Sequence, residues 1–177
     1  SVADSANRFA GKETFVYRLT LTTGPFVEYT YPLAVSPAGP RDIELVGWNL
    51  PNELRRFPVP LDSGLGTKIL FDARISNPFA IQVQSRPCQV RGSDKLQQIA
   101  APVTLTGRVE RKGSSDGYQF DAKKGEELSF RAASRTLGFP VDPVLRLSDA
   151  TGKTLLQSKA AKIGADAALD YTATQEG

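Results

Sequence analysis

Residues 15–31 contain the pattern that decides the fold. Phe15-Val16-Tyr17-Arg18-Leu19-Thr20-Leu21 alternates in period two, and Thr23-Gly24-Pro25 then interrupts the run. Residues 27–31 continue the alternation through Val27, Tyr29 and Tyr31. A period of two places successive side chains on opposite faces of a strand, and Gly-Pro marks a turn. The stretch therefore predicts two strands, each with one apolar face, separated by a turn.

The same period recurs along the chain, with turn signals every 8–12 residues. Further strands are predicted at 43–47, 68–72, 79–83, 103–109, 118–122, 128–132, 143–148, 155–156 and 169–173. Residues 166–169 are the one stretch that reads as a weak helical turn. The polar sequence Arg91-Gly92-Ser93-Asp94 separates two patterned regions. The predicted fold class is therefore all-β, with two consecutive β-sandwich modules that meet near residue 92.

Composition excludes several kinds of chemistry. The 177 residues include no His, which removes Ser-His-Asp triads, Cys-His dyads and zinc sites that need imidazole. A single Cys cannot form an intrachain disulfide or a thiolate cluster. No apolar run approaches 18 residues, so no membrane span is predicted. With no Met at all, the chain reads as a piece of a longer protein or as a processed form.

The charge gives no sign of a nucleic-acid partner. Twenty-two Lys and Arg face nineteen Asp and Glu, which leaves a net charge of +3. The basic residues are spread along the chain, whereas nucleic-acid binders gather them on one face among stacking aromatic residues. We expect a solvated surface of mixed sign.

Residues 101–173 resemble the bacterial pre-peptidase C-terminal domain, a small β-sandwich attached to secreted enzymes and surface proteins. The resemblance rests on several short stretches that follow one another in the order of that family. They are residues 102–107, Asp116-Gly117-Tyr118-Gln119-Phe120, Lys124-Gly125-Glu126-Glu127-Leu128, residues 137–147 and Asp149-Ala150-Thr151-Gly152-Lys153. The resemblance implies an extracellular or cell-surface protein with an adhesive, spacing or accessory role.

The region before it, residues 33–92, is similar to Ig-like or TIG-like spacer domains through Ile43-Glu44-Leu45-Val46-Gly47-Trp48-Asn49-Leu50. The pre-peptidase family normally ends in a further strand, placed just after Gly177. Residues 1–32 resemble that missing strand pair plus a connector. This resemblance implies that residues 93–177 form a sandwich lacking its last strands. Residues 1–22 of one chain are then expected to complete residues 98–177 of the next, by strand addition.

The residues predicted to take part in such contacts are Phe15, Tyr17, Leu19, Leu21, Trp48 and Tyr171. The predicted partners are copies of this chain or neighbouring domains of the same protein. Polysaccharide and matrix protein remain alternatives. An exposed row of aromatic residues would favour sugar binding. Trp48, Tyr29, Tyr31, Phe57 and Phe79 are the candidates for such a row, although packing in a core or corner is the favoured interpretation.

Acidic residues at strand ends raise the question of Ca²⁺. Asp116, Asp121, Asp142 and Asp149 lie at such positions. Relatives that bind Ca²⁺ use an acidic linker, but residues 93–98 here contain one acid and one base, so those ligands do not carry over. We predict no cofactor, with Ca²⁺ as the less favoured alternative. Asp116 and Asp149 are predicted to cap turns, and Asp142 to pair with Arg135 or Arg146.

No catalytic motif emerges. Cys88 is expected to be a buried free thiol with nothing nearby to lower its pKa. The sequence contains no Ser-x-x-Lys motif, no phosphate-binding loop and no paired carboxylates of glycosidase type. The predicted function is a non-catalytic structural or adhesive module. Its alternatives are a carbohydrate- or matrix-binding module and an accessory domain of a secreted hydrolase.

Overall fold

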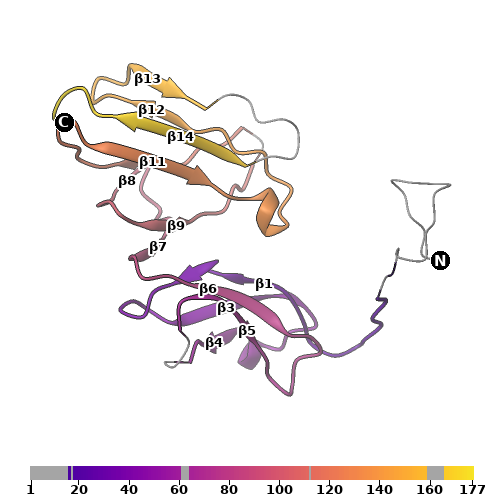
Figure 1. The fold of residues 1–177 in the computed structure, drawn as a ribbon. Helices are drawn as coiled ribbons and strands as arrows, with labels where there is room; N and C mark the ends of the chain where they lie inside the picture. Colours follow the sequence, from indigo (N-terminus) through magenta and orange to yellow (C-terminus); the bar gives the residue numbers. More distant parts are fainter. Residues whose placement is uncertain (1–15, 17, 61–63, 112, 159–165) are drawn as a thin grey trace. The chain divides into compact units, whose positions relative to one another are not determined.

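The computed structural model describes residue 16 and residues 18–60, 64–111, 113–158 and 166–177 (Figure 1). Within these residues the chain forms fourteen short strands and two 3-10 helices, and no α-helix. The all-β fold class is therefore confirmed. The chain divides into two compact units: unit 1 comprises residues 1–92 and 102–114, and unit 2 comprises residues 93–101 and 115–177.

Unit 1 contains two three-stranded sheets, with the strand orders β1-β3-β4 and β2-β6-β5, and a short parallel pair of β7 with β9. Its strands are β1 (Phe26–Tyr31), β2 (Ala34–Val35), β3 (Asp42–Trp48), β4 (Arg56–Pro58), β5 (Gly66–Leu70), β6 (Phe79–Val83), β7 (Cys88–Val90) and β9 (Thr104–Thr106). A 3-10 turn, η1 (Asn52–Leu54), connects β3 to β4. Figure 1 shows the strands of this unit and the 3-10 turn between β3 and β4.

Both sheets of unit 1 contribute to one hydrophobic core. Leu45 of β3 is fully buried, and Ile43 and Ile81 are nearly so. Phe57 of β4 meets Phe79 of β6 edge to face, with ring centroids 5.1 Å apart. The core cluster consists of Val27, Val35, Ile43, Leu45, Leu50, Leu54, Val59, Leu70, Ile75, Phe79, Ile81 and Val83. The apolar residues that alternate in the sequence therefore form the inward faces of two sheets, which pack against each other.

A register shift in β1 changes which side chains face this core. The pairing of β1 with β3 is irregular between Val27 and Tyr29, so Glu28 is the extra residue of a bulge. Val27 and Thr30 are three positions apart, yet both are 2% exposed. In a regular strand, residues three apart point to opposite faces. The bulge therefore brings both to the core and leaves Glu28 exposed.

Asn77 links the two sheets of unit 1 beside this bulge. Its side-chain nitrogen donates to the Val27 carbonyl at 2.8 Å, and the Val27 amide donates to its Oδ1 at 2.9 Å. The Thr30 hydroxyl donates to the Ala80 carbonyl at 3.2 Å. These bonds satisfy backbone and side-chain groups that β1 would otherwise leave unpaired in a largely buried position.

Unit 2 consists of three strand pairs, in which β8 runs parallel to β10 while β11 with β14 and β12 with β13 are antiparallel. Its elements are β8 (Leu96–Gln98), β10 (Gly117–Gln119), β11 (Glu127–Ala132), η2 (Arg135–Leu137), β12 (Arg146–Ser148), β13 (Thr154–Gln157) and β14 (Ala167–Thr172). The pairing of β11 with β14 is the longest, with six residues on each strand. This pairing contains two of the buried apolar residues of the unit, Ala167 and Leu169.

The apolar face of unit 2 is only partly covered. Among its described residues, the buried apolar side chains are Ala167, Leu169 and Ala173, all in or next to β14. Phe120 and Phe130 contact each other with centroids 5.7 Å apart, but both are half-buried. The other inward positions of β11, β12 and β14 are half-buried as well: Leu128, Ala132, Leu147 and Tyr171.

Three expectations from the sequence are corrected. Residues 166–169 do not form a helical turn, because β14 pairs with β11 from Ala167 onward. The strand predicted at 15–21 is not formed in its described part, since residue 16 and residues 18–21 have no strand partner. Within the predicted strands 103–109 and 143–148, only Thr104–Thr106 and Arg146–Ser148 are paired.

The division into units also differs from the predicted one. The chain does leave unit 1 after Gly92, at the predicted polar boundary, but residues 102–114 return to unit 1. The return follows from strand pairing, because β9 lies beside β7 in register Cys88 with Thr104. Residues 26–31, predicted to belong to a strand pair and connector outside the first module, form the first strand of unit 1.

Candidate functional site

The predicted contact residues do not gather at one place. Phe15 and Tyr17 lie outside the described residues. Leu19 and Leu21 are 73% and 95% exposed. Tyr171 is half-buried on β14, opposite Leu128, and its hydroxyl lies 3.5 Å from the Thr174 hydroxyl. Only Trp48 belongs to a built polar arrangement with an exposed aromatic ring.

Trp48 ends β3 with 66% of its surface exposed, so the prediction that it packs in a core or corner is wrong. Its indole Nε1–H donates to Glu28 Oε1 at 2.8 Å. Asn49, in the left-handed region at φ 54°, turns the chain away directly after Trp48. Its side-chain nitrogen donates to the Thr23 carbonyl at 3.3 Å. The ring is therefore held by its edge, while most of the surface of Trp48 stays exposed.

Gly47 allows this arrangement. A Cβ at this position would lie 2.0 Å from the Phe26 carbonyl oxygen and 2.9 Å from the Val27 Cα. Any side chain would push β1 away from β3 at the bulge that carries Glu28. The absence of a side chain at Gly47 is therefore what lets Glu28 approach Trp48.

A second aromatic side chain on the same pair of strands already holds a cation. Tyr31 of β1 and Glu44 of β3 are register partners. The Arg108 guanidinium lies 3.8 Å from the Tyr31 ring centroid, and its Nη2 lies 2.9 Å from Glu44 Oε2. Arg108 belongs to the segment 102–114 that returns to unit 1. The contact combines a cation–π interaction with an ion pair.

The other members of the proposed aromatic row are less accessible. Tyr29 and Tyr31 are half-buried, and Arg108 covers Tyr31. Phe79 is buried and Phe57 packs against the core, which confirms core packing for these two residues. In the described part of the chain, the five candidates therefore do not form an exposed row for sugar stacking.

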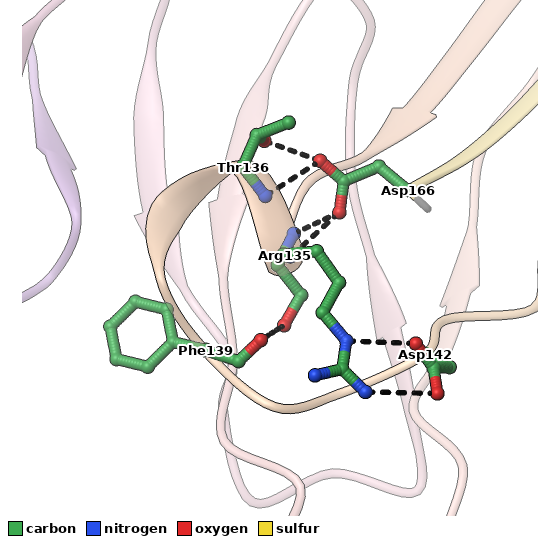
Figure 2. Close-up of polar contacts among 6 residues, drawn as sticks. Arg135, Thr136, Phe139, Asp142 and Asp166 are labelled. Atoms are coloured by element: carbon green, nitrogen blue, oxygen red, sulfur yellow. Dashed lines mark hydrogen bonds and ion pairs between the residues drawn. The ribbon is translucent and has the colours of Figure 1, made fainter. Parts of the chain in front are cut away.

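Unit 2 contains a polar network around Asp166, which lies directly before β14 (Figure 2). The Asp166 carboxylate accepts the backbone amides of Ser134 at 2.7 Å, Arg135 at 2.8 Å and Thr136 at 3.3 Å. The Thr136 hydroxyl also donates to it. These bonds satisfy the free amides at the start of η2, as an N-terminal cap does. They lower the pKa of Asp166 to about 2, with the Thr136 hydroxyl as the largest cause.

The same loop is closed by a second carboxylate. Arg135 donates from Nε to Asp142 Oδ1 at 2.8 Å and from Nη2 to Asp142 Oδ2 at 3.0 Å, as Figure 2 shows. The ion pair predicted for Asp142 is therefore confirmed, with Arg135 as the partner. Gly138 ends η2 in the left-handed conformation at φ 88°, and the Ser134 hydroxyl donates to the Phe139 carbonyl. The loop is thus fixed at both ends.

Asp149 caps a turn, as predicted. Its Oδ1 accepts the backbone amides of Thr151 at 2.9 Å and Lys153 at 3.1 Å. The hydrogen bond from the Thr151 hydroxyl is the largest cause of the lowered pKa of Asp149, and the two amide bonds add to it. Cys88 is a free thiol in β7, as expected, but it is half-buried, and burial raises its pKa.

Ionisation states follow from these contacts. Asp149 and Asp166 stay charged at neutral pH, and the Cys88 thiol stays protonated. None of the three is poised for proton transfer or nucleophilic attack near pH 7. Among the described residues, no group of three or more Cys, Asp or Glu is arranged to hold a metal ion.

No local pattern in the sequence indicated that Glu28, Arg108 or Asp166 would organise these contacts. Glu28 depends on a bulge, and Arg108 on a segment that returns to unit 1. The Asp166 carboxylate lies just before a strand and caps a 3-10 turn that is distant in the sequence. Such a contact has no local sequence pattern either.

Comparison of the chain with protein-family models, curated proteins and solved structures gives no significant match. The described part of the chain contains no helix of the length and apolar character needed to cross a membrane.

Proposed function

We propose that this chain is a non-catalytic structural or adhesive module of an extracellular or cell-surface protein, and that it associates head to tail by strand addition. In this association, residues 1–22 of one chain pair with the apolar face of unit 2 in the next. The observation that carries the proposal is the incomplete cover over that face. Leu128, Phe130 and Leu147 remain half-buried, whereas the inward apolar residues of β3 and β6 in unit 1 are buried.

The sequence of the N-terminal segment suits it to be the added strand. Residues 15–21 alternate in period two, with Phe15, Tyr17, Leu19 and Leu21 on one face. In its described part, Leu19 and Leu21 expose most of their surface. Added strands gain affinity from backbone pairing and specificity from alternate side chains in apolar pockets. Each large apolar side chain that becomes fully buried contributes roughly 1.5–3 kcal/mol.

The geometry of such a contact determines the assembly. A donor strand in one part of the chain and an acceptor face in another make a heterologous contact, which builds open chains or filaments. We therefore expect the average mass to rise continuously with concentration, rather than to stop at a dimer.

Light scattering on the full chain and on a variant lacking residues 1–22 tests the association. The mass of the full chain should rise with concentration, and the deletion variant should stay monomeric. Leu19→Asp should abolish the rise, while Thr20→Asp, one position along and on the opposite face of the strand, should leave most of it. A full chain that stays monomeric at high concentration would contradict strand addition.

The proposal that the chain is non-catalytic is tested separately. A panel of peptide, ester and glycoside substrates should show no turnover above buffer. Turnover that copurifies with the chain and disappears on replacement of one Ser, Asp or Glu would overturn it.

Binding of polysaccharide or matrix protein is a second candidate function, and the exposed ring of Trp48 favours it. Indole faces stack on the apolar faces of sugar rings, so a glycan titration followed by Trp48 fluorescence is the direct test.

A further inference from the structure

The outer face of β1 and β3 carries two pairs that each combine an aromatic ring with a carboxylate. In the first, Tyr31 and Glu44 hold the guanidinium of Arg108 between ring face and carboxylate. In the second, Glu28 of β1 accepts the indole N–H of Trp48 on β3. Both pairs draw one residue from each of the same two strands.

The two pairs differ in their cationic partners. Within the described residues, the cation of the first pair comes from Arg108, and neither Trp48 nor Glu28 has a cationic partner. Trp48 nevertheless exposes 66% of its surface, and Glu28 is exposed beside it. The second pair therefore presents a ring face and a carboxylate to solvent in the same combination that binds Arg108 in the first.

The hydrogen bond between Trp48 and Glu28 limits the kinds of ligand that this pair can bind. Because the indole N–H already donates to Glu28, the Trp48 side chain has no hydrogen-bond donor left and offers a ligand its π system instead. The Glu28 carboxylate is an acceptor with a second oxygen, so it favours a ligand with positive charge and N–H donors. Trp is the aromatic residue that attracts cations most strongly.

We propose that Trp48 and Glu28 form a binding site for an arginine side chain presented by another polypeptide. A guanidinium is planar and weakly hydrated, so it can stack on the indole while its N–H groups donate to the carboxylate. A lysine ammonium is a strongly hydrated point charge and loses more hydration on the same ring. A neutral sugar would leave the Glu28 charge without a counter-charge. This site is separate from the strand addition proposed above, since it uses neither residues 1–22 nor unit 2.

The experiment uses the full chain and one signal, because Trp48 is its only Trp. The probe is the acetylated and amidated tripeptide Gly-Arg-Gly, with Gly-Lys-Gly and Gly-Gln-Gly as matched controls. We expect a saturable change in Trp48 fluorescence with the arginine peptide, a change several-fold weaker with the lysine peptide and none with the glutamine peptide. Raising the salt concentration should weaken the arginine signal, because the pair is exposed.

Two matched variants locate the site. Glu28→Gln keeps an acceptor for the indole but removes the charge, and it should lower the affinity several-fold. Glu44→Gln removes the corresponding charge from the Tyr31 pair and should leave the Trp48 signal unchanged.

Several results would overturn the proposal. One is a Trp48 response that is equal for the arginine and glutamine peptides, or absent for both. Another is an arginine response that persists unchanged in Glu28→Gln. Saturable binding of a neutral oligosaccharide with no response to arginine would assign the ring to glycan stacking instead. Because light scattering does not enter this test, its failure and the failure of strand addition are distinguishable.

Discussion

Unit 1 and unit 2 use the same alternating sequence pattern but cover their apolar faces to different degrees. In unit 1, two sheets face each other and enclose a cluster of twelve buried apolar residues. In unit 2, the described buried apolar residues are Ala167, Leu169 and Ala173. An apolar strand face becomes a core only when a second layer covers it.

Polar contacts are correspondingly prominent in unit 2. Asp166 caps η2, Arg135 pairs with Asp142 across one loop, and Arg131 pairs with Asp170 between β11 and β14. The Arg131–Asp170 pair is largely exposed and the Arg135–Asp142 pair is partly exposed, so each ion pair contributes little to the global free energy of unfolding. The contacts of Asp166 and Asp142 fix loop conformations, and none of these contacts replaces a core. The comparison therefore predicts that unit 1 is the more stable unit and that unit 2 gains most from a partner.

The largest loss of stability is expected from a substitution that creates a cavity in the core of unit 1. Leu45→Ala removes a fully buried side chain and should lower the free energy of unfolding by about 2–5 kcal/mol. Leu128→Ala, in the half-buried row of unit 2, should cost less than half as much. Urea unfolding of both variants measures the difference. Equal losses would mean that the two cores are equivalent.

A smaller loss is expected when a methyl group is added at the bulge. Gly47→Ala places a Cβ against the Phe26 carbonyl and should destabilise unit 1 by about 1–3 kcal/mol through overpacking. It should also shift Trp48 fluorescence, because the approach of Glu28 depends on the same contact. Gly64→Ala is the control, since its Cβ would meet only Lys68 Nζ at 3.5 Å. If the two variants unfold alike, the close approach of β1 to β3 does not constrain stability.

The polar network of unit 2 should respond to acid. The folded pKa of Asp166 is about 2, below its ordinary value of 3.8. A depressed carboxyl pKa gives stability that is present above the unfolded pKa and is lost as the pH falls toward the folded one. Amide hydrogen exchange at Ser134, Arg135 and Thr136 should therefore accelerate, relative to intrinsic rates, between about pH 4 and pH 2.

The control for this acid response is Asp166→Asn, which cannot change its charge. Its three amides should be less protected at neutral pH, and the acid step should vanish from them. A step that survives in the variant would assign the acid response to another carboxyl group.

Removing the guanidinium from the surface of unit 1 should have a modest effect. Arg108→Ala loses an exposed ion pair with Glu44 and a cation–π contact with Tyr31, together worth about 1 kcal/mol or less. Lys at this position keeps the charge and should recover part of the loss. Thermal unfolding at low and high salt measures it, and a loss of several kcal/mol would indicate that Arg108 anchors the segment 102–114.

The smallest effect is expected from divalent metal. Melting temperatures in millimolar Ca²⁺ and in chelator should agree within a few degrees. A ligand at about 100 times its dissociation constant adds roughly 2.7 kcal/mol, which such a comparison detects easily. A stabilisation of that size would reveal a metal site.

The sequence alone determined the fold class and the positions of most long strands. Alternation of side chains and turn residues are local properties, so β6 and β11 lie within one residue of their predicted bounds. Local pairs were also predictable, because Asp142 is seven residues from Arg135 and Asp149 caps its own turn. The strand predicted at 15–21 shows the limit of prediction from a local pattern, because alternation alone does not supply a strand to pair with.

Only the tertiary structure decided which residues act together. Arg108 meets Glu44 across 64 positions of sequence, and Asp166 caps η2 across about thirty. Glu28 reaches Trp48 through a bulge that needs Gly47 on the neighbouring strand. Register, bulges and the return of residues 102–114 to unit 1 depend on how strands from distant parts of the chain pair. A local pattern carries no information about that choice, because pairing energy comes from the partner strand.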